Sequence, residues 1–492
     1  MLKTYLVATI LGLLFSLGFA PNDLWFLSIF SLTCVHFLIQ KNNKRELFFV
    51  GYFFGIGLWT VGISWLYVSI HYYGNIGTLW SSILTLLFIL IISIYSGLTL
   101  LLYNYLRSDS KILSIFSLPI AWIVVEYLRS ILFTGFPWLI SGTMLAATPL
   151  DGWTPIIGAQ GNTFFLLLLS SLFYHLISNL KYYKSALLSL ILLMTLVVSS
   201  LALKNKSWTQ LDGSVMASVV QTNLELKQKW STEGVIKTKN MIEEAIERGV
   251  EEEIIVFPET ALIFSQSEMA DWIVDIDNQA REKGITLLTG IVEREDNFKV
   301  RNRILGLGEA DTHYDKIKLV PFGEFIPFEH LTGKLFDILG LKLTNTLPGE
   351  ELNIINAGNI RISASICYEI AFPDLIRKTA FDSNLIVTIS NDTWFGRSYG
   401  PIQHLEIAQN RALEHKKAIL RSTNSGISAF ISKNGEIIEK QSYFEDKLLR
   451  KEINLYKGET FYAKYGNFPL FLIISIMFMY LFINNRKNYI FN

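Results

Sequence analysis

Charged side chains are scarce in this chain of 492 residues. They make up 17% of the sequence, whereas soluble domains average about 25%, so an ordinary soluble globule is excluded. Apolar residues account for 51%, which excludes a disordered chain. The 43 basic residues balance the 43 acidic ones, and this zero net charge gives no electrostatic basis for binding nucleic acid.

Cysteines and ligand-binding motifs are scarce as well. The two cysteines, Cys34 and Cys367, cannot form a disulfide framework. The seven histidines show none of the spacings of common metal sites. The chain also lacks the glycine-rich motifs that hold phosphates or dinucleotides. The sequence therefore predicts neither a metal site nor a cofactor.

Long apolar runs are what the chain has instead, mostly in residues 1–203, which hold only 14 charged side chains. A run of roughly 20 apolar residues is long enough to cross a bilayer as a helix. Eight candidate spans cover residues 6–20, 24–40, 47–70, 79–106, 112–133, 155–177, 186–203 and 468–483. This pattern predicts a multi-pass α-helical membrane bundle. Residues 1–203 would form its seven-span domain, and residues 461–492 the last span with a short tail.

The first run also fits a signal peptide, because Lys3 precedes it and Gly18-Phe19-Ala20 has the small residues of a cleavage site. Pro21 follows directly, and the next apolar run begins three residues later. Both features favour a helix that is retained.

Basic residues in the short loops indicate the orientation of the bundle. They gather on one side: Lys3, Lys41, Lys44, Arg45, Arg107, Lys111, Lys181, Lys184, Arg486 and Lys487. The loops around residues 21–23, 71–78 and 134–154 carry no Lys or Arg. Because Lys and Arg mark the cytoplasmic side, both termini are expected in the cytoplasm and residues 204–460 on the extracytoplasmic side.

Two charges lie within the fifth span, Glu126 and Arg129, three residues apart and therefore on one helical face. Charges inside a membrane are rare. A structural ion pair facing the bundle is the plainer interpretation, and a functional site is the alternative. Residues 134–138 must then break the helix, because they include Gly135 and Pro137.

Residues 204–460 have a different pattern, in which short strands alternate with amphipathic helices. Expected strands cover 214–221, 253–257, 285–292, 299–307, 313–319, 360–367, 385–390, 427–432 and 437–439, and expected helices cover 232–248, 268–283, 373–381 and 403–417. This alternation predicts an α/β domain with helices covering sheets.

Three strand ends in this domain carry reactive side chains. Glu259 follows a buried strand, at an edge where α/β sheets place active sites. Lys316 and Lys318 share one face of the strand 313–319, and Glu324 follows a sharp exit from it. Cys367 ends a strand before a helix, whose N-terminus lowers the pKa of a thiol. Taken singly, a solvated glutamate, an exposed basic face and an inert buried thiol explain these residues too.

Taken together, the motifs resemble a known family. Pro258-Glu259, Lys316 and Cys367-Tyr368-Glu369, in that order, are similar to the Glu–Lys–Cys triad of the nitrilase superfamily. Longer strings resemble the apolipoprotein N-acyltransferases: residues 135–138, 256–260, 319–324, 390–396, 421–426 and 465–469. The resemblance covers nearly the whole chain, including the spans.

This resemblance implies an extracytoplasmic nitrilase-like domain, a four-layer α-β-β-α sandwich, in the cytoplasmic (inner) membrane of a bacterium. It also implies a two-step, ping-pong acyl transfer. The enzyme takes the sn-1 acyl chain of a membrane phospholipid onto a Cys thioester. It then passes that chain to the α-amino group of the diacylglyceryl-cysteine that begins an apolipoprotein. The partners are thus a phospholipid donor, a lipoprotein acceptor and the membrane.

Site residues follow from the same resemblance. Glu259 would be the general base, Lys316 the charge stabiliser and Cys367 the nucleophile. Supporting or substrate-binding roles would fall to Glu324, Tyr368, Glu369, Trp230 and Trp394. Carboxylates crowded around one thiol are expected to raise each other's pKa, and Lys316 would offset part of this.

Two other functions stay open. A membrane-tethered amidase acting on an extracytoplasmic amide would use the same triad. A transporter or receptor with a catalytically dead exported domain is the second alternative, and the intact triad argues against it. The apolar density of residues 322–343 favours lipid substrates, because this segment is expected to dip into the membrane interface as an arm over the site. A subdomain packed on the core is the alternative interpretation of this segment.

Overall fold

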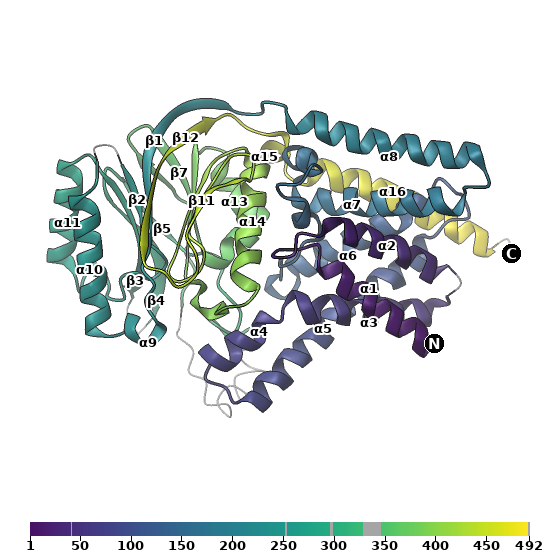
Figure 1. Ribbon diagram of the computed structural model, residues 1–492, viewed down its shortest axis with the longest axis horizontal. Coiled ribbons are helices and arrows are strands. Elements are labelled where there is room, and N and C mark those ends of the chain that lie inside the picture. The colour runs from purple at the N-terminus through teal and green to yellow at the C-terminus, as the bar shows by residue number, and fades with distance from the viewer. Residues whose placement is uncertain (41, 251–252, 296–298, 328–345, 491–492) are drawn as a thin grey trace. The chain divides into compact units, whose positions relative to one another are not determined.

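The computed structural model describes residues 1–492 except 41, 251–252, 296–298, 328–345 and 491–492. Most of the predicted apolar arm, residues 322–343, lies outside the described residues. The chain forms two compact units (Figure 1). The first comprises Met1–Lys206, Arg397–Glu406 and Tyr465–Asn492, and the second comprises Ser207–Gly396 and Ile407–Lys464.

The first unit is helical. Its helices are α1 (Leu2–Ser16), α2 (Trp25–Ile39), α3 (Lys44–Gly62), α4 (Trp65–Val68), the π-helix η1 (Ser69–Tyr73), α5 (Thr78–Leu106), α6 (Ser114–Ile131), α7 (Thr154–Ser178), α8 (Tyr183–Lys204) and α16 (Phe468–Ile490). Within the described residues, four helical segments are long and apolar enough to cross a membrane, those of α5, α6, α7 and α8. A fifth span results if α3 and Trp65–Tyr73, bent by 53°, count as one.

Each of the eight predicted spans thus contains a helix, but three of them are shorter than a full crossing. These are Leu2–Ser16, Trp25–Ile39 and Phe468–Asn484. The chain is a membrane protein with four or five apolar spans by length and composition.

Small residues allow the helices of this unit to approach closely. A Cβ atom on Gly12 of α1 would overlap the carbonyl oxygen of Phe54 in α3, and one on Gly57 of α3 would overlap that of Thr9 in α1. Membrane helices pack through such small residues because apolar side chains gain little from leaving lipid.

The chain between α6 and α7 is irregular, as predicted for residues 134–138. It contains the 3₁₀ turns η2 (Leu132–Thr134), η3 (Ser141–Leu145) and η4 (Asp151–Trp153). Phe133, Thr134, Gly135 and Leu139 all have positive φ. The helix therefore ends here, and the free backbone groups of this loop need partners inside the bundle.

Two six-stranded sheets form the second unit, so the predicted α/β fold is confirmed. The first sheet has the order β12-β1-β2-β3-β4-β5, and the second has the order β11-β10-β9-β8-β7-β6. The strands are β1 (Gln210–Gln221), β2 (Ile254–Val256), β3 (Thr286–Arg294), β4 (Val300–Gly308), β5 (His313–Asp315), β6 (Ile354–Ala357), β7 (Ile360–Ile366), β8 (Leu385–Ser390), β9 (Ile419–Thr423), β10 (Ala429–Ile431), β11 (Ile437–Lys440) and β12 (Lys447–Lys457). In each sheet three adjacent strands run parallel, β1-β2-β3 and β7-β8-β9.

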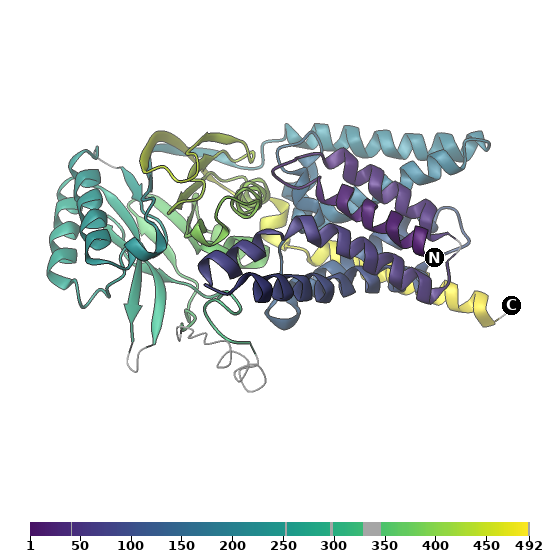
Figure 2. The same ribbon diagram turned by 60° about the horizontal axis from the view of Figure 1, so that its bottom comes forward.

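Helices α10 and α11 cover the outer face of the first sheet, and α13 and α14 cover that of the second (Figures 1 and 2). The short helices α9 and α15 complete this unit. The bounds of these helices are α9 (Leu226–Lys229), α10 (Thr232–Glu247), α11 (Ala270–Glu282), α13 (Pro373–Ala380), α14 (Gly400–His415) and α15 (Phe461–Tyr465). Ile242 and Ile246 of α10 and Ile273 and Ile276 of α11 recur at helical spacing and bury against the first sheet. A separate core of buried residues from both sheets fills the space between them. The result is an α-β-β-α sandwich.

Candidate active site

The candidate residues all lie in the second unit, where strands of the two sheets end. Glu259 follows β2 by three residues, and Cys367 directly follows β7. Asn391 directly follows β8, and its backbone N–H donates to Glu259 Oε2 at 2.7 Å. The ends of strands from both sheets therefore meet at one site.

Glu259 is buried and fully hydrogen-bonded. Its Oε1 accepts from Lys316 Nζ at 3.2 Å and from Asn302 Nδ2 at 2.6 Å. Burial raises the pKa of Glu259, but the charges of Lys316 and Lys229 and these hydrogen bonds outweigh it, so the net shift is downward. The expectation of a raised pKa is therefore wrong for Glu259, because two cations and two hydrogen bonds outweigh the effect of burial.

Lys316 lies between two carboxylates. Its Nζ donates to Glu324 Oε1 at 2.7 Å as well as to Glu259, and only 1% of the residue is exposed. Burial lowers the pKa of Lys316, but Glu259 and Glu324 hold it well above its ordinary value. The ammonium charge is therefore permanent at neutral pH.

The strand predicted for residues 313–319 ends early, at Asp315. The backbone N–H groups of Ile317 and Lys318 both donate to Glu369 Oε1, at 2.7 and 2.9 Å. Consecutive N–H groups of a strand point in opposite directions, so this contact is incompatible with strand geometry. Lys316 is buried whereas Lys318 is exposed. The prediction that both lysines lie on one face of a strand is therefore wrong.

Glu369 is buried completely and accepts three further hydrogen bonds. The Tyr314 hydroxyl donates to both of its oxygens, and the Ile366 N–H donates to Oε2 at 2.8 Å. Burial raises the pKa of Glu369 to about 7, against the opposing effect of the backbone N–H donors. Glu369 thus fixes the backbone on both sides of the site.

Cys367 begins the short 3₁₀ helix η6 (Cys367–Ala371) with a φ of +53°. Such a backbone conformation costs about 1–3 kcal/mol and is typical of functional residues. Burial raises the pKa of the Cys367 thiol, Glu259 raises it further, and Lys316 lowers it only in part. The predicted lowering by a helix N-terminus is therefore wrong: the thiol is protonated at rest and needs a base.

The sequence interpretation missed two residues of this cluster. Lys229 is 2% exposed, and its Nζ donates to the Glu259 carbonyl oxygen at 2.8 Å. Burial lowers the pKa of Lys229 to about 8. Asn302 supplies a hydrogen bond to Glu259 from β4. Lys229 could have been found from the sequence, because it directly precedes the candidate residue Trp230. Asn302 lies between two arginines, and nothing in this sequence context indicates a role in the site.

The remaining predicted residues border the cluster or are exposed. Glu324 Oε2 accepts from the Val320 N–H at 2.7 Å. Tyr368 is 9% exposed, and its ring packs edge-on against Phe372. Trp230 and Trp394 are 54% and 44% exposed, respectively, so both rings offer apolar surface.

Chemically, this arrangement is suited to nucleophilic attack on a carbonyl carbon. It combines a thiol, an ionised carboxylate and a fixed cation that can stabilise an oxyanion. Among the described residues, no group of three or more His, Cys, Asp or Glu side chains is arranged to hold a metal ion.

Two family models match the chain. Residues 11–172 match the apolipoprotein N-acyltransferase N-terminal domain, and residues 216–461 match the carbon-nitrogen hydrolase family.

Similar proteins cover almost the whole chain. The apolipoprotein N-acyltransferase of Pasteurella multocida is 32% identical over 96% of this chain and 94% of its own length. That of Azotobacter vinelandii is 33% identical over 94% and 92%. Among solved structures, Nit3 of Saccharomyces cerevisiae, a nitrilase-superfamily member, has a TM-score of 0.38 and 18% identity, covering 50% of this chain and 93% of Nit3.

Glu259→Gln tests the charge balance at the thiol. Removing the carboxylate charge is expected to lower the pKa of Cys367, because Lys316 then acts on the thiol unopposed. The alkylation rate of Cys367 by iodoacetamide at pH 8 should rise several-fold, and its pH profile should shift to lower pH. A shift to higher pH would contradict the account.

Gly290→Ala tests the placement of Glu259. A Cβ atom at this position of β3 would lie 2.5 Å from Thr260 N and 2.8 Å from Glu259 Cα, so the glutamate must move. The alkylation profile of Cys367 should shift in the same direction as in Glu259→Gln. Gly249→Ala is the matched control. The added Cβ atom would lie 2.6 Å from Ile285 Cδ1, near the end of β2 that is remote from Glu259. This variant should leave the alkylation profile of Cys367 unchanged.

Proposed function

The chain belongs to the apolipoprotein N-acyltransferase family, and on that premise we propose that Cys367 carries an acyl chain from a membrane phospholipid to a lipoprotein. The acceptor is the α-amino group of an N-terminal diacylglyceryl-cysteine. The observation that supports this proposal most directly is the partly buried Cys367 thiol, whose pKa depends on both Glu259 and Lys316.

The first half-reaction forms a thioester. Glu259 takes the thiol proton while Cys367 Sγ attacks the ester carbonyl carbon of the phospholipid. The resulting oxyanion faces the Lys316 ammonium and a backbone N–H of the Cys367–Tyr368 turn. When the C–O bond breaks, Glu259 returns the proton to the leaving oxygen, and a lysophospholipid departs.

The second half-reaction forms an amide. An α-amino group has a pKa near 8, so part of it is neutral and nucleophilic at neutral pH. It attacks the thioester carbon and loses its proton to Glu259. The C–S bond breaks, and the proton returns to the thiolate, which restores the resting site.

The supporting residues have separate roles in this proposal. Glu324 holds Lys316 from the side opposite Glu259, and Glu369 fixes the backbone around residues 317 and 366. Tyr368, which directly follows Cys367, and the half-exposed rings of Trp230 and Trp394 contact the substrates in this proposal, because aromatic surface suits an acyl chain. No cofactor takes part.

We further propose the domain organisation and topology that the loop charges favour. Residues 1–203 and 461–492 form eight spans, the shorter helices included, with both termini in the cytoplasm. Residues 204–460 form the catalytic domain on the periplasmic face of a bacterial inner membrane. Both substrates are lipids, and a site next to the membrane avoids extracting their chains into water, which costs about 0.8 kcal/mol per CH₂.

Mass spectrometry of the intact, detergent-purified protein tests this function. Incubation with a defined phospholipid should add one fatty acyl group, sensitive to hydroxylamine, and a diacylglyceryl-cysteine lipopeptide should remove it. Cys367→Ser should abolish the adduct. Cys34→Ser is the matched control, because this second cysteine lies in α2, and it should retain the adduct.

A membrane-tethered amidase predicts a different result. Small amides would then modify Cys367, and no phospholipid would. That outcome would contradict the transferase proposal while leaving the triad intact.

A further inference from the structure

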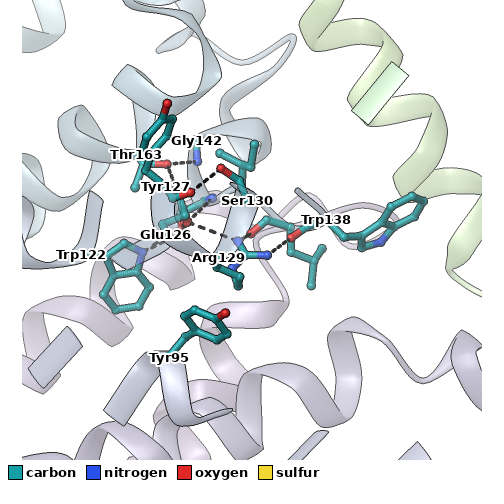
Figure 3. A network of polar contacts seen from close by, with 12 residues as sticks. Tyr95, Trp122, Glu126, Tyr127, Arg129, Ser130, Trp138, Gly142 and Thr163 are labelled. Carbon is teal, nitrogen blue, oxygen red and sulfur yellow. Dashed lines mark hydrogen bonds and ion pairs between the residues drawn. The ribbon is translucent and has the colours of Figure 1, made fainter. Parts of the chain in front are cut away.

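A dense polar network lies inside the first unit, around Glu126 and Arg129 of α6 (Figure 3). These side chains are 6% and 4% exposed, with 3.9 Å between Glu126 Oε2 and Arg129 Nη2. The acyl-transfer chemistry makes no use of them. Buried charges in a membrane bundle are costly, so they are kept where they hold something in place.

Glu126 binds the irregular loop at the start of η3. Its Oε2 accepts from the backbone N–H of Ser141 at 2.9 Å and from the Ser141 hydroxyl at 2.6 Å. Its Oε1 accepts from the Thr163 hydroxyl of α7 at 2.5 Å. One carboxylate therefore joins α6, the start of η3 and α7.

Arg129 binds the same loop between η2 and η3. Its guanidinium donates to the carbonyl oxygens of Phe136 at 2.7 Å, Trp138 at 2.6 Å and Leu139 at 3.3 Å. Figure 3 shows the guanidinium directed at this loop, while the Trp138 ring projects away from the ion pair. By binding these carbonyl oxygens, the planar guanidinium group of Arg129 fixes the backbone that orients the Trp138 side chain.

Trp138 in turn holds Gln403. The indole N–H groups of Trp138 and Trp65 both donate to Gln403 Oε1, at 2.8 and 3.2 Å. Trp138 is 1% exposed and Gln403 is 2% exposed. Gln403 lies in Arg397–Glu406, which packs with the membrane helices although the chain on both sides belongs to the second unit.

The segment Arg397–Glu406 closely follows an active-site residue in the chain. Arg397 comes six residues after Asn391, whose N–H holds the Glu259 carboxylate. We infer that Glu126, Arg129, Trp138 and Gln403 form a positioning device, which anchors the chain leaving the active-site turn to the membrane helices. It promotes reaction with substrates that lie in the membrane and does not affect the reactivity of the thiol. This inference rests on the proposed function.

Gln403→Met tests the device, because methionine has a similar length and no strong acceptor. Acylation of Cys367 from phospholipid in proteoliposomes should slow about tenfold, while alkylation of Cys367 by iodoacetamide stays within about twofold of wild type. Gln403→Glu, which keeps an acceptor oxygen, should restore acylation. Arg129→Lys, which keeps the charge and loses the fork, should behave like Gln403→Met.

Gln409→Met is the matched control, the same change in the same helix. Gln409 Nε2 donates to the Gly435 carbonyl oxygen instead, and this variant should acylate normally. Equal acylation in Gln403→Met and wild type would overturn the inference. So would a parallel loss of alkylation, because the effect would then lie in the active site itself.

Hydrogen exchange separates this inference from the proposed function. In Gln403→Met the amides of residues 397–406 should exchange faster than in wild type and in Gln409→Met. Unchanged exchange would refute the anchor even if the enzyme is active. A wild-type protein that never acylates Cys367 would refute the proposed function, and faster exchange would still support the anchor.

Discussion

The Lys316 ammonium group between the Glu259 and Glu324 carboxylates is the contact on which the rest of the site depends. Lys316 is almost completely buried, and so is Glu259. Removing one partner of a buried ion pair costs about 3–5 kcal/mol, because the other charge stays behind unpaired. Glu259 and Lys316 therefore keep each other ionised, and the pKa of the neighbouring Cys367 thiol stays above its ordinary value.

The fold provides this contact by bringing strands of two sheets to a common edge. β2 and its continuation place Glu259, the turn after β7 places Cys367, and Asn391 after β8 binds Glu259 through its backbone. Glu369 fixes the segment that carries Lys316. The positive φ of Cys367 is a strained backbone conformation, and the surrounding hydrogen-bonded segments hold it in place. A preorganised site of this kind stabilises developing charge without rearranging during the reaction.

The membrane helices and the α/β pattern could be predicted from the sequence, because apolar runs and periodicity are local signals. The order of the motifs around Glu259, Lys316 and Cys367 predicted a triad, and its catalytic role stays a prediction. Strands such as β9 could not be predicted, because its buried Arg421 interrupts the apolar pattern and only the structure shows its partner, Asp392. The pKa of Cys367 was predicted in the wrong direction, since it depends on burial and on a carboxylate 108 positions away in the sequence. Lys229 and Gln403 were missed for the same reason: their partners are distant in the chain.

The central claim is that Cys367 is a protonated thiol in the resting enzyme and that Glu259 removes its proton during the attack. The most direct measurement is the ultraviolet absorbance of the thiolate, taken as the difference between wild type and Cys367→Ser across a pH titration. The account predicts no thiolate signal at pH 7 and a signal that emerges only above the pKa of an ordinary cysteine, about 8.5. A full thiolate signal at pH 7 would contradict it, because the site would then hold a preformed ion pair and need no base.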